Sequence, residues 1–249
     1  SNLRIIGGEA FYGCININSE LSLPETVEYI GYKAFAAGDQ VWDSYIMQEM
    51  KLTGTLTLPD NLTYLGSEAF GGCRSLTGSL VIPPSITKIE DSTFNSCTGL
   101  NGNLILHDGI TDIGEKAFNY CSFSGELKLP SYLTEINDSS FSGCNFTSIA
   151  GFPEGIITIG DKAFNNNSRL MGIMELPESL LSIGKDAFRN CSNIEGVIIP
   201  ADIVVISDNA FENCFYINKF VCKAIEPPLV GSMGLSGVAK DNFVLEVPE

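Results

Sequence analysis

Apolar and polar positions follow one order that returns again and again along the chain. The marker is a phenylalanine, and successive markers are 23 or 24 residues apart except for one interval of 35, from Phe35 to Phe70. Five residues before each marker stands an aliphatic residue, usually followed by Gly. A repeat this regular indicates stacked copies of one small structural unit. The markers are Phe11, Phe35, Phe70, Phe94, Phe118, Phe141, Phe164, Phe188 and Phe211.

Each unit contains the signals of two short extended segments and one turn. Alternation in residues 55–59 and 126–130 predicts a strand of period two that ends at Pro. A second extended piece follows, as in residues 62–65, and we expect the A-F-x-x-C segment to form one helical turn begun by a capping residue. The expected caps are Ser67, Asp91, Asp138, Asp161 and Asp208. The inward strand pairs are Leu56/Leu58, Leu80/Ile82, Leu104/Leu106, Leu127/Leu129 and Met174/Leu176.

A unit of this size cannot bury its own apolar face, but stacked units roof one another. We therefore predict an α/β repeat solenoid, mostly β, in which about nine units of 23–24 residues form a single domain over residues 1–249. An insertion of 11 residues lies within residues 36–50, and residues 215–249 form an atypical C-terminal capping region. The first unit starts without a polar cap, so we expect the chain to belong to something longer or to pair there.

Charge narrows the possible partners. The formal net charge is −16, from 30 acidic and 14 basic residues. Such a surface repels phosphate backbones and anionic lipids, which argues against nucleic acid as a ligand. We see no run of eighteen apolar residues, so we expect no membrane insertion of this segment. Cationic proteins, neutral glycans and divalent cations remain as partners, and solubility alone also explains the charge.

Seven of the eight cysteines occupy one slot, three residues after the marker. A catalytic thiol would occur once, and neither the CxxC nor the CxxH spacing of a zinc site occurs. Neighbouring rungs of a ladder could approach disulfide distance, but aligned side chains disfavour the required dihedral angle. We predict reduced, buried thiols, and leave open a bond between Cys214 and Cys222. The ladder is Cys14, Cys73, Cys97, Cys121, Cys144, Cys191 and Cys214.

Other candidates for chemistry are few, and we expect no cofactor and no metal. His107 is the only histidine, stands where other units have Pro, and leaves little room for a Ser-His or Cys-His system. Acidic residues after the strand end could attract Ca²⁺ if stacked, but they lack the spacing of a dedicated loop and suit solvated turns. These acids are Glu25, Asp60, Asp108, Glu154 and Glu178.

Two features suggest a binding surface. One is the outward column of the period-two strands, where Val81 and Ile105 are adjacent apolar exceptions, although β-propensity alone would also explain them. The other is the insertion, where Trp42 and Tyr45 are of the types enriched in binding hot spots. The insertion could instead fold back as a lid over the first units. The outward column is Ser22, Thr57, Val81, Ile105, Lys128, Gly151, Glu175 and Ile198.

The unit L-P-x-x-L-T-x-I-G-x-x-A-F-x-x-C resembles the BspA-like leucine-rich repeats of bacterial surface proteins. The resemblance covers nearly the whole chain. It implies a right-handed solenoid with a parallel sheet on the concave side, a surface or secreted location with any signal peptide removed or outside this segment, and roles in adhesion.

The leading hypothesis is a non-enzymatic interaction module that binds an extracellular protein or glycan through the concave sheet, with the Trp42 loop extending that surface. The alternatives are a structural spacer that presents another domain and, third, a glycan-active enzyme.

Overall fold

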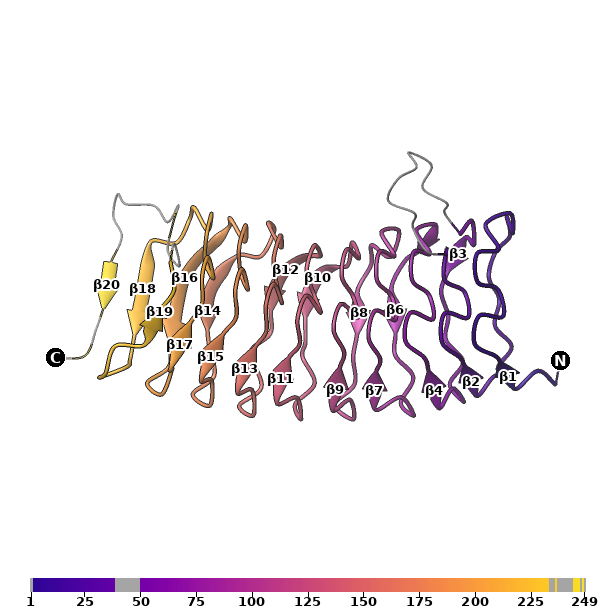
Figure 1. Cartoon of the computed structure of the whole chain (residues 1–249), viewed down its shortest axis with the longest axis horizontal. Coiled ribbons are helices and arrows are strands. Elements are labelled where there is room, and N and C mark those ends of the chain that lie inside the picture. The colour runs from indigo at the N-terminus through magenta and orange to yellow at the C-terminus, as the bar shows by residue number, and fades with distance from the viewer. Residues whose placement is uncertain (1, 39–49, 233–235, 237–243, 247, 249) are drawn as a thin grey trace.

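The protein is an elongated solenoid whose coils follow one another along a single long axis (Figure 1). The computed structural model describes residues 2–38, 50–232, 236, 244–246 and 248. The chain makes about nine turns of parallel β-structure. The two ends of the chain lie at opposite ends of the long axis, so each coil contacts only its neighbours. This arrangement agrees with the predicted repeat solenoid.

Two columns of short parallel strands run along the solenoid. The first ladder comes from the second extended piece of each unit, and it comprises β1 (Ile5–Ile6), β2 (Tyr29–Ile30), β4 (Tyr64–Leu65), β7 (Lys88–Ile89), β9 (Asp112–Ile113), β11 (Glu135–Ile136), β13 (Thr158–Ile159), β15 (Ser182–Ile183), β17 (Val205–Ile206) and β19 (Leu229–Val230). Its sheets are β1-β2-β4, β7-β9 and β11-β13-β15-β17-β19. All of these pairs are parallel, as in β13 with β15.

The second ladder comes from the predicted period-two strands and the residues just before them. It comprises β3 (Gly54–Thr55), β5 (Leu76–Thr77), β6 (Leu80–Val81), β8 (Leu104–Ile105), β10 (Ser124–Leu127), β12 (Asn145–Ile149), β14 (Gly172–Glu175), β16 (Ile194–Ile199), β18 (Lys219–Cys222) and β20 (Val244–Glu246). Its sheets are β3-β5, β6-β8, β10-β12 and β14-β16-β18-β20. Strands β18, β19 and β20 lie in the expected C-terminal capping region and continue both ladders.

The core is a continuous apolar interior shared by all coils. Every residue of the predicted inward strand pairs is buried, which confirms the period-two alternation. The marker phenylalanines form one stack, with ring centroids 5.2 Å apart between Phe35 and Phe70 and 5.6 Å between Phe94 and Phe118. The rings are nearly parallel because successive coils repeat the same side-chain position. Phe11, at the first coil, is stacked on Phe35 and remains partly exposed.

The predicted helical turn, and with it the α/β label, is not confirmed, because the described residues contain no helix. The A-F-x-x-C segment instead forms consecutive tight turns. In the coil of Phe118 the backbone φ is positive at Lys116 (54°) and Tyr120 (52°), which is incompatible with an α-helix. Some backbone N–H groups of this segment bond to the next coil and others bond within their own coil. The N–H of Phe118 donates to the carbonyl of Ser140 in the next coil, whereas the N–H of Cys121 donates to the carbonyl of Phe118. Bonds between coils therefore replace the helical ladder.

The four expected aspartate caps serve the next coil rather than a helix of their own. Oδ1 of Asp138 accepts a hydrogen bond from the N–H of Asp161 at 2.7 Å, and Asp161 does the same for Lys185. The glycine that follows the aliphatic residue allows this close approach. A Cβ atom at Gly184 would lie 2.5 Å from the backbone carbonyl carbon of Gly160. Gly stands here because of the crowding between coils.

The cysteines line a buried column beside the phenylalanine stack. Cys14 is half-buried and the other six members of the predicted ladder are buried, and all eight thiols, including Cys222, are free. Each buried thiol lies near the carbonyl oxygen of the marker in the coil before, as for Cys97 and Phe70 at 3.0 Å. Burial raises the pKa of Cys97 and of Cys214 to about 12.

Candidate interaction surfaces

The outward column predicted for the second ladder is present as a row of exposed side chains. Val81 and Ile105 are paired in register on β6 and β8 and are 54% and 49% exposed. Thr57, Lys128 and Glu175 are also exposed, together with Ser22 and Gly151, whereas Ile198 is half-buried. The column is therefore mixed, with one isolated apolar pair. Trp42 and Tyr45 lie outside the described residues, so their place relative to this column is not assigned.

His107 connects two neighbouring turns. Its Nδ1 accepts a hydrogen bond from the N–H of Gly109 at 3.1 Å, and Nε2 lies 3.0 Å from the carbonyl oxygen of Pro83. This geometry fits the neutral tautomer with the proton on Nε2, which donates to the preceding coil. Both ring nitrogens are engaged with the backbone, so His107 stabilises the stack at the slot where other units have Pro.

The acidic residues that follow the strand ends make separate local contacts. Ser131 donates its hydroxyl to Oδ1 of Asp108 at 2.8 Å, and this bond is the main reason that the pKa of Asp108 lies below its ordinary value. A hydrogen-bonded ion pair with Lys223 lowers the pKa of Glu178. Among the described residues no group of three or more His, Cys, Asp or Glu side chains could hold a metal ion. The arrangement fits solvated turn carboxylates.

A larger apolar surface lies along the first ladder in the C-terminal half of the protein. Ile157, Leu181 and Val204 precede β13, β15 and β17 and are 46%, 40% and 56% exposed. They are consecutive rungs, because the N–H of Leu181 donates to the carbonyl of Ile157 and that of Val204 to the carbonyl of Leu181. Exposed Leu229 follows in the next coil and exposed Tyr132 stands in the coil before Ile157. We call these five residues the apolar stripe.

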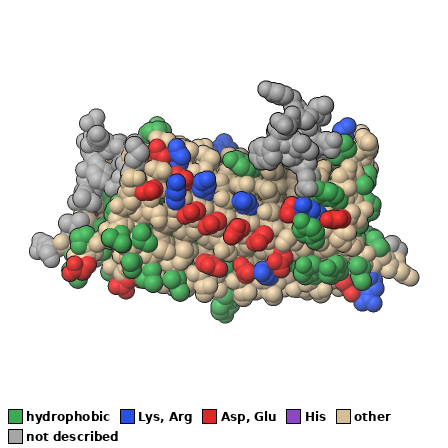
Figure 2. Space-filling view, in the orientation of Figure 1, with side chains coloured by type: hydrophobic (Ala, Val, Ile, Leu, Met, Phe, Trp, Pro, Cys, Tyr) green, Lys and Arg blue, Asp and Glu red, His purple; other side chains and the backbone are tan. Residues whose placement is uncertain are grey.

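Figure 2 shows hydrophobic side chains gathered at the lower edge of the C-terminal half, over β13, β15 and β17, below rows of acidic side chains. Exposed apolar patches of several neighbouring residues on a soluble protein commonly mark contact sites.

The same slot in earlier coils shows that the strand does not require these apolar residues. In the coils of β4, β7, β9 and β11 the slot holds Thr63, Thr87, Thr111 and Thr134, all exposed. Threonine is β-branched and suits an extended backbone as well as Ile or Val. Sequence reasoning missed the stripe because it examined only the outward column of the second ladder. A comparison of this slot between units would have revealed the change from Thr to Ile, Leu and Val.

Acidic side chains surround the stripe. Glu154 precedes Ile157 and Asp202 precedes Val204 in the same turns, Glu135 follows Thr134, and Glu226 precedes Leu229; all four acids are exposed. None of the four forms an ion pair with another residue in the described part of the chain. The surface is thus apolar along its centre and negative at its margins.

In the described ranges no helix is long and apolar enough to cross a membrane.

Comparisons with known proteins agree with this fold. The family profile described as the BspA type leucine-rich repeat region matches residues 1–54, 42–171 and 134–225, in 6 copies. A comparison with curated proteins finds no match.

Among solved structures, a leucine-rich repeat protein from Bacteroides ovatus is similar with a TM-score of 0.53 and 18% identity, over 99% of this chain and 82% of the other. The T. pallidum leucine-rich repeat protein has a TM-score of 0.54 and 24% identity, over 65% of this chain and 78% of the other. The pneumococcal vaccine antigen PcpA has a TM-score of 0.56 and 17% identity, over 98% of this chain and 63% of the other. At these identities the likeness shows the fold.

Proposed function

This chain belongs to the BspA-type leucine-rich repeat family, and from that premise we propose that it is a non-enzymatic module that binds a protein partner at or outside a bacterial surface. The single observation that carries the proposal is the apolar stripe. Repeat arrays bind through surfaces whose residues vary while the buried residues repeat. The stripe has this property, because its slot holds Thr in four consecutive coils and Ile, Leu and Val in the next three.

The partner that fits this surface is a protein with an apolar patch bordered by basic residues. The stripe would bury apolar side chains from water, which is favourable by roughly 25 cal/mol per Å². Glu135, Glu154, Asp202 and Glu226 would face the basic border. The net charge of −16 would speed the approach of a cationic partner, and association would weaken as salt is added.

Two features support a binding role without chemistry. The sole histidine is engaged with backbone groups on both ring nitrogens. The six buried thiols are repeated in register, and burial raises the pKa of thiols such as Cys121 well above the ordinary value, which suppresses the thiolate that a nucleophile requires. The same burial would protect them from oxidation outside the cell, which is consistent with the proposed location.

The experiment replaces the stripe by the residues that earlier coils carry in the same slot. The triple variant Ile157→Thr, Leu181→Thr, Val204→Thr places at each position the β-branched residue that four earlier coils carry there, so it should fold. Binding would be measured by biolayer interferometry against purified extracellular proteins of known isoelectric point. The expected result is salt-sensitive binding of at least one basic protein by the natural chain, weakened at least tenfold in the triple variant.

A matched control tests the predicted outward column. The variant Val81→Thr, Ile105→Thr makes the same chemical change at two equally exposed positions on β6 and β8. We expect it to bind like the natural chain. Loss of binding in this variant, with binding retained in the triple variant, would move the contact surface to the second ladder. Absence of binding to every basic protein tested would refute the proposal.

A further inference from the structure

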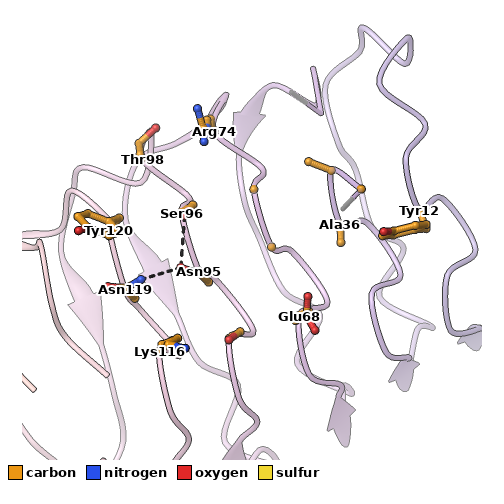
Figure 3. A pocket seen from close by; sticks show the side chains of 15 residues that line it. Tyr12, Ala36, Glu68, Arg74, Asn95, Ser96, Thr98, Lys116, Asn119 and Tyr120 are labelled. Atoms are coloured by element: carbon orange, nitrogen blue, oxygen red, sulfur yellow. Dashed lines mark hydrogen bonds between the residues drawn. The ribbon is translucent and has the colours of Figure 1, made fainter. Parts of the chain in front are cut away.

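A trough runs along the tight turns, and none of its lining residues belongs to the apolar stripe. It consists of two adjoining grooves with volumes of about 770 and 510 Å³, which share Asn119 and Tyr120 as their common border. Figure 3 shows the larger groove, with Tyr12 at one end and Tyr120 at the other. The surface is shallow and long, a shape suited to a chain-like ligand that lies across several coils.

Amide and hydroxyl groups line this trough. Asn119 donates from Nδ2 to Oδ1 of Asn95 at 3.0 Å, and Ser96 donates to the same oxygen at 3.3 Å (Figure 3). The Nδ2 group of Asn95 and the Oδ1 atom of Asn119 have no partner among the described residues. This pair of amides therefore keeps one free donor and one free acceptor, both of which can bond the hydroxyl groups of a sugar.

Tyr120 occupies a backbone position that a tyrosine rarely takes. Its φ is +52°, and the same slot in other coils holds small or polar residues, namely Gly72, Ser96, Gly143, Asn166, Asn190 and Asn213. A bulky residue in this region is strained, and such strain gathers at functional positions. The ring packs on the backbone at Gly143 and remains 52% exposed between the two grooves. An aromatic face placed there suits the partially positive C–H groups of a sugar ring.

The trough is also basic in a strongly acidic protein. Its lining contains the cations Arg74, Lys116, Lys162 and Arg189, four in all, against the anions Glu68 and Asp186, two in all. Glu68 pairs with Lys33, and Arg189 pairs with both Asp186 and Glu212. Lys116 and Lys162 are exposed and form no ion pair with any described residue. They stand on either side of the coil at Gly143 and could receive carboxylates.

We propose that this trough binds an acidic saccharide, a chain of sugars of which some carry a carboxylate. Tyr120 stacks on a sugar ring, Asn95 and Asn119 bond its hydroxyl groups, and Lys116 and Lys162 pair with carboxylates. The proposal uses none of the residues of the apolar stripe and is independent of the partner proposed for it.

The test uses hexagalacturonate and a hyaluronan hexasaccharide as acidic probes and maltohexaose as the neutral probe, measured by isothermal titration calorimetry. The natural chain is expected to bind an acidic probe at least tenfold more tightly than maltohexaose. Tyr120→Asn places in the slot the residue found in three other coils, so it should fold with equal or greater stability. It should weaken binding at least tenfold.

Two further variants separate the contributions. Lys116→Gln with Lys162→Gln should weaken acidic probes and flatten the dependence of binding on salt. Tyr132→Ala, at an exposed tyrosine of the apolar stripe, should leave saccharide binding unchanged, as should the triple threonine variant. Failure of both acidic probes to bind at 10 mM, equal binding of maltohexaose, or unchanged binding by Tyr120→Asn would each overturn the proposal.

Discussion

The Sγ atom of Cys121 lies 3.1 Å from the carbonyl oxygen of Phe94 in the preceding coil. The same contact recurs for Cys73, Cys97, Cys144, Cys191 and Cys214. A thiol is a small apolar side chain with a weak donor, so it fills the column and adds a second hydrogen bond to a carbonyl that already accepts one from a backbone N–H, as Phe94 does from Cys97. The cysteine slot is therefore defined by size and by a weak hydrogen bond between coils.

Replacing Cys121 by Ala should destabilise the protein by about 2 kcal/mol, because the change leaves a small cavity and removes the thiol hydrogen bond to the carbonyl of Phe94. The unfolding midpoint in urea would measure the loss. Cys222→Ala is the control, since Cys222 is half-buried and outside the ladder. Equal effects of the two substitutions would contradict the role of the slot.

Asn167 occupies the cysteine slot in its own coil and shows that another side chain with a donor can take the place of the thiol. Its Nδ2 donates to the carbonyl of Phe141 at 2.8 Å, while its buried Oδ1 has no partner. Asn167→Cys retains a donor and removes the unsatisfied oxygen, so we expect stability to rise by about 1 kcal/mol. A fall in the urea midpoint would show that the second amide bond, to Phe164 at 2.9 Å, outweighs the orphaned oxygen.

The buried thiols should make the fold sensitive to alkaline pH. Burial raises the pKa of Cys97 from 9.0 to about 12, because it penalises the thiolate. The folded state thus holds its proton more tightly than the unfolded state. The stabilisation is fully present below pH 9 and is lost as pH rises from about 9 to about 12. The free energy of unfolding of Cys97→Ala should fall less steeply with pH over this range than that of the natural chain. Identical slopes for the two proteins would exclude the Cys97 thiol as a source of the pH dependence.

Crowding between coils predicts different outcomes for two glycines of the same slot. At Gly184 a Cβ atom would lie 2.6 Å from the backbone nitrogen of Asp161, whereas at Gly7 nothing stands within 4 Å. Gly184→Ala should cost about 3 kcal/mol through overpacking, and Gly7→Ala should be nearly neutral. Thermal unfolding of both variants would check this. A large loss for Gly7→Ala would point to a local backbone preference in place of crowding.

The buried side of this fold was predictable, since a period of 23 or 24 residues fixes which side chains point inward. The turn at Phe118 was not, because Lys116 and Tyr120 have no intrinsic preference for positive φ, and their N–H partners lie in the next coil, distant in sequence. The capping acids were recognised by type, but Asp138 serves Asp161 one coil away. The apolar stripe and the trough depend on which slots become neighbours across coils.

The hydrogen bonds that join coils, such as that from Phe118 to Ser140, run along the long axis of the solenoid. Tension applied through the two chain ends would pass through every coil, but a terminal coil is held by a neighbour on one side only and should yield first. The array should then peel coil by coil, and each rupture would release 23 or 24 residues, or about 80 Å of slack chain. Tethered between two surfaces, the protein would yield in steps and absorb work at each one.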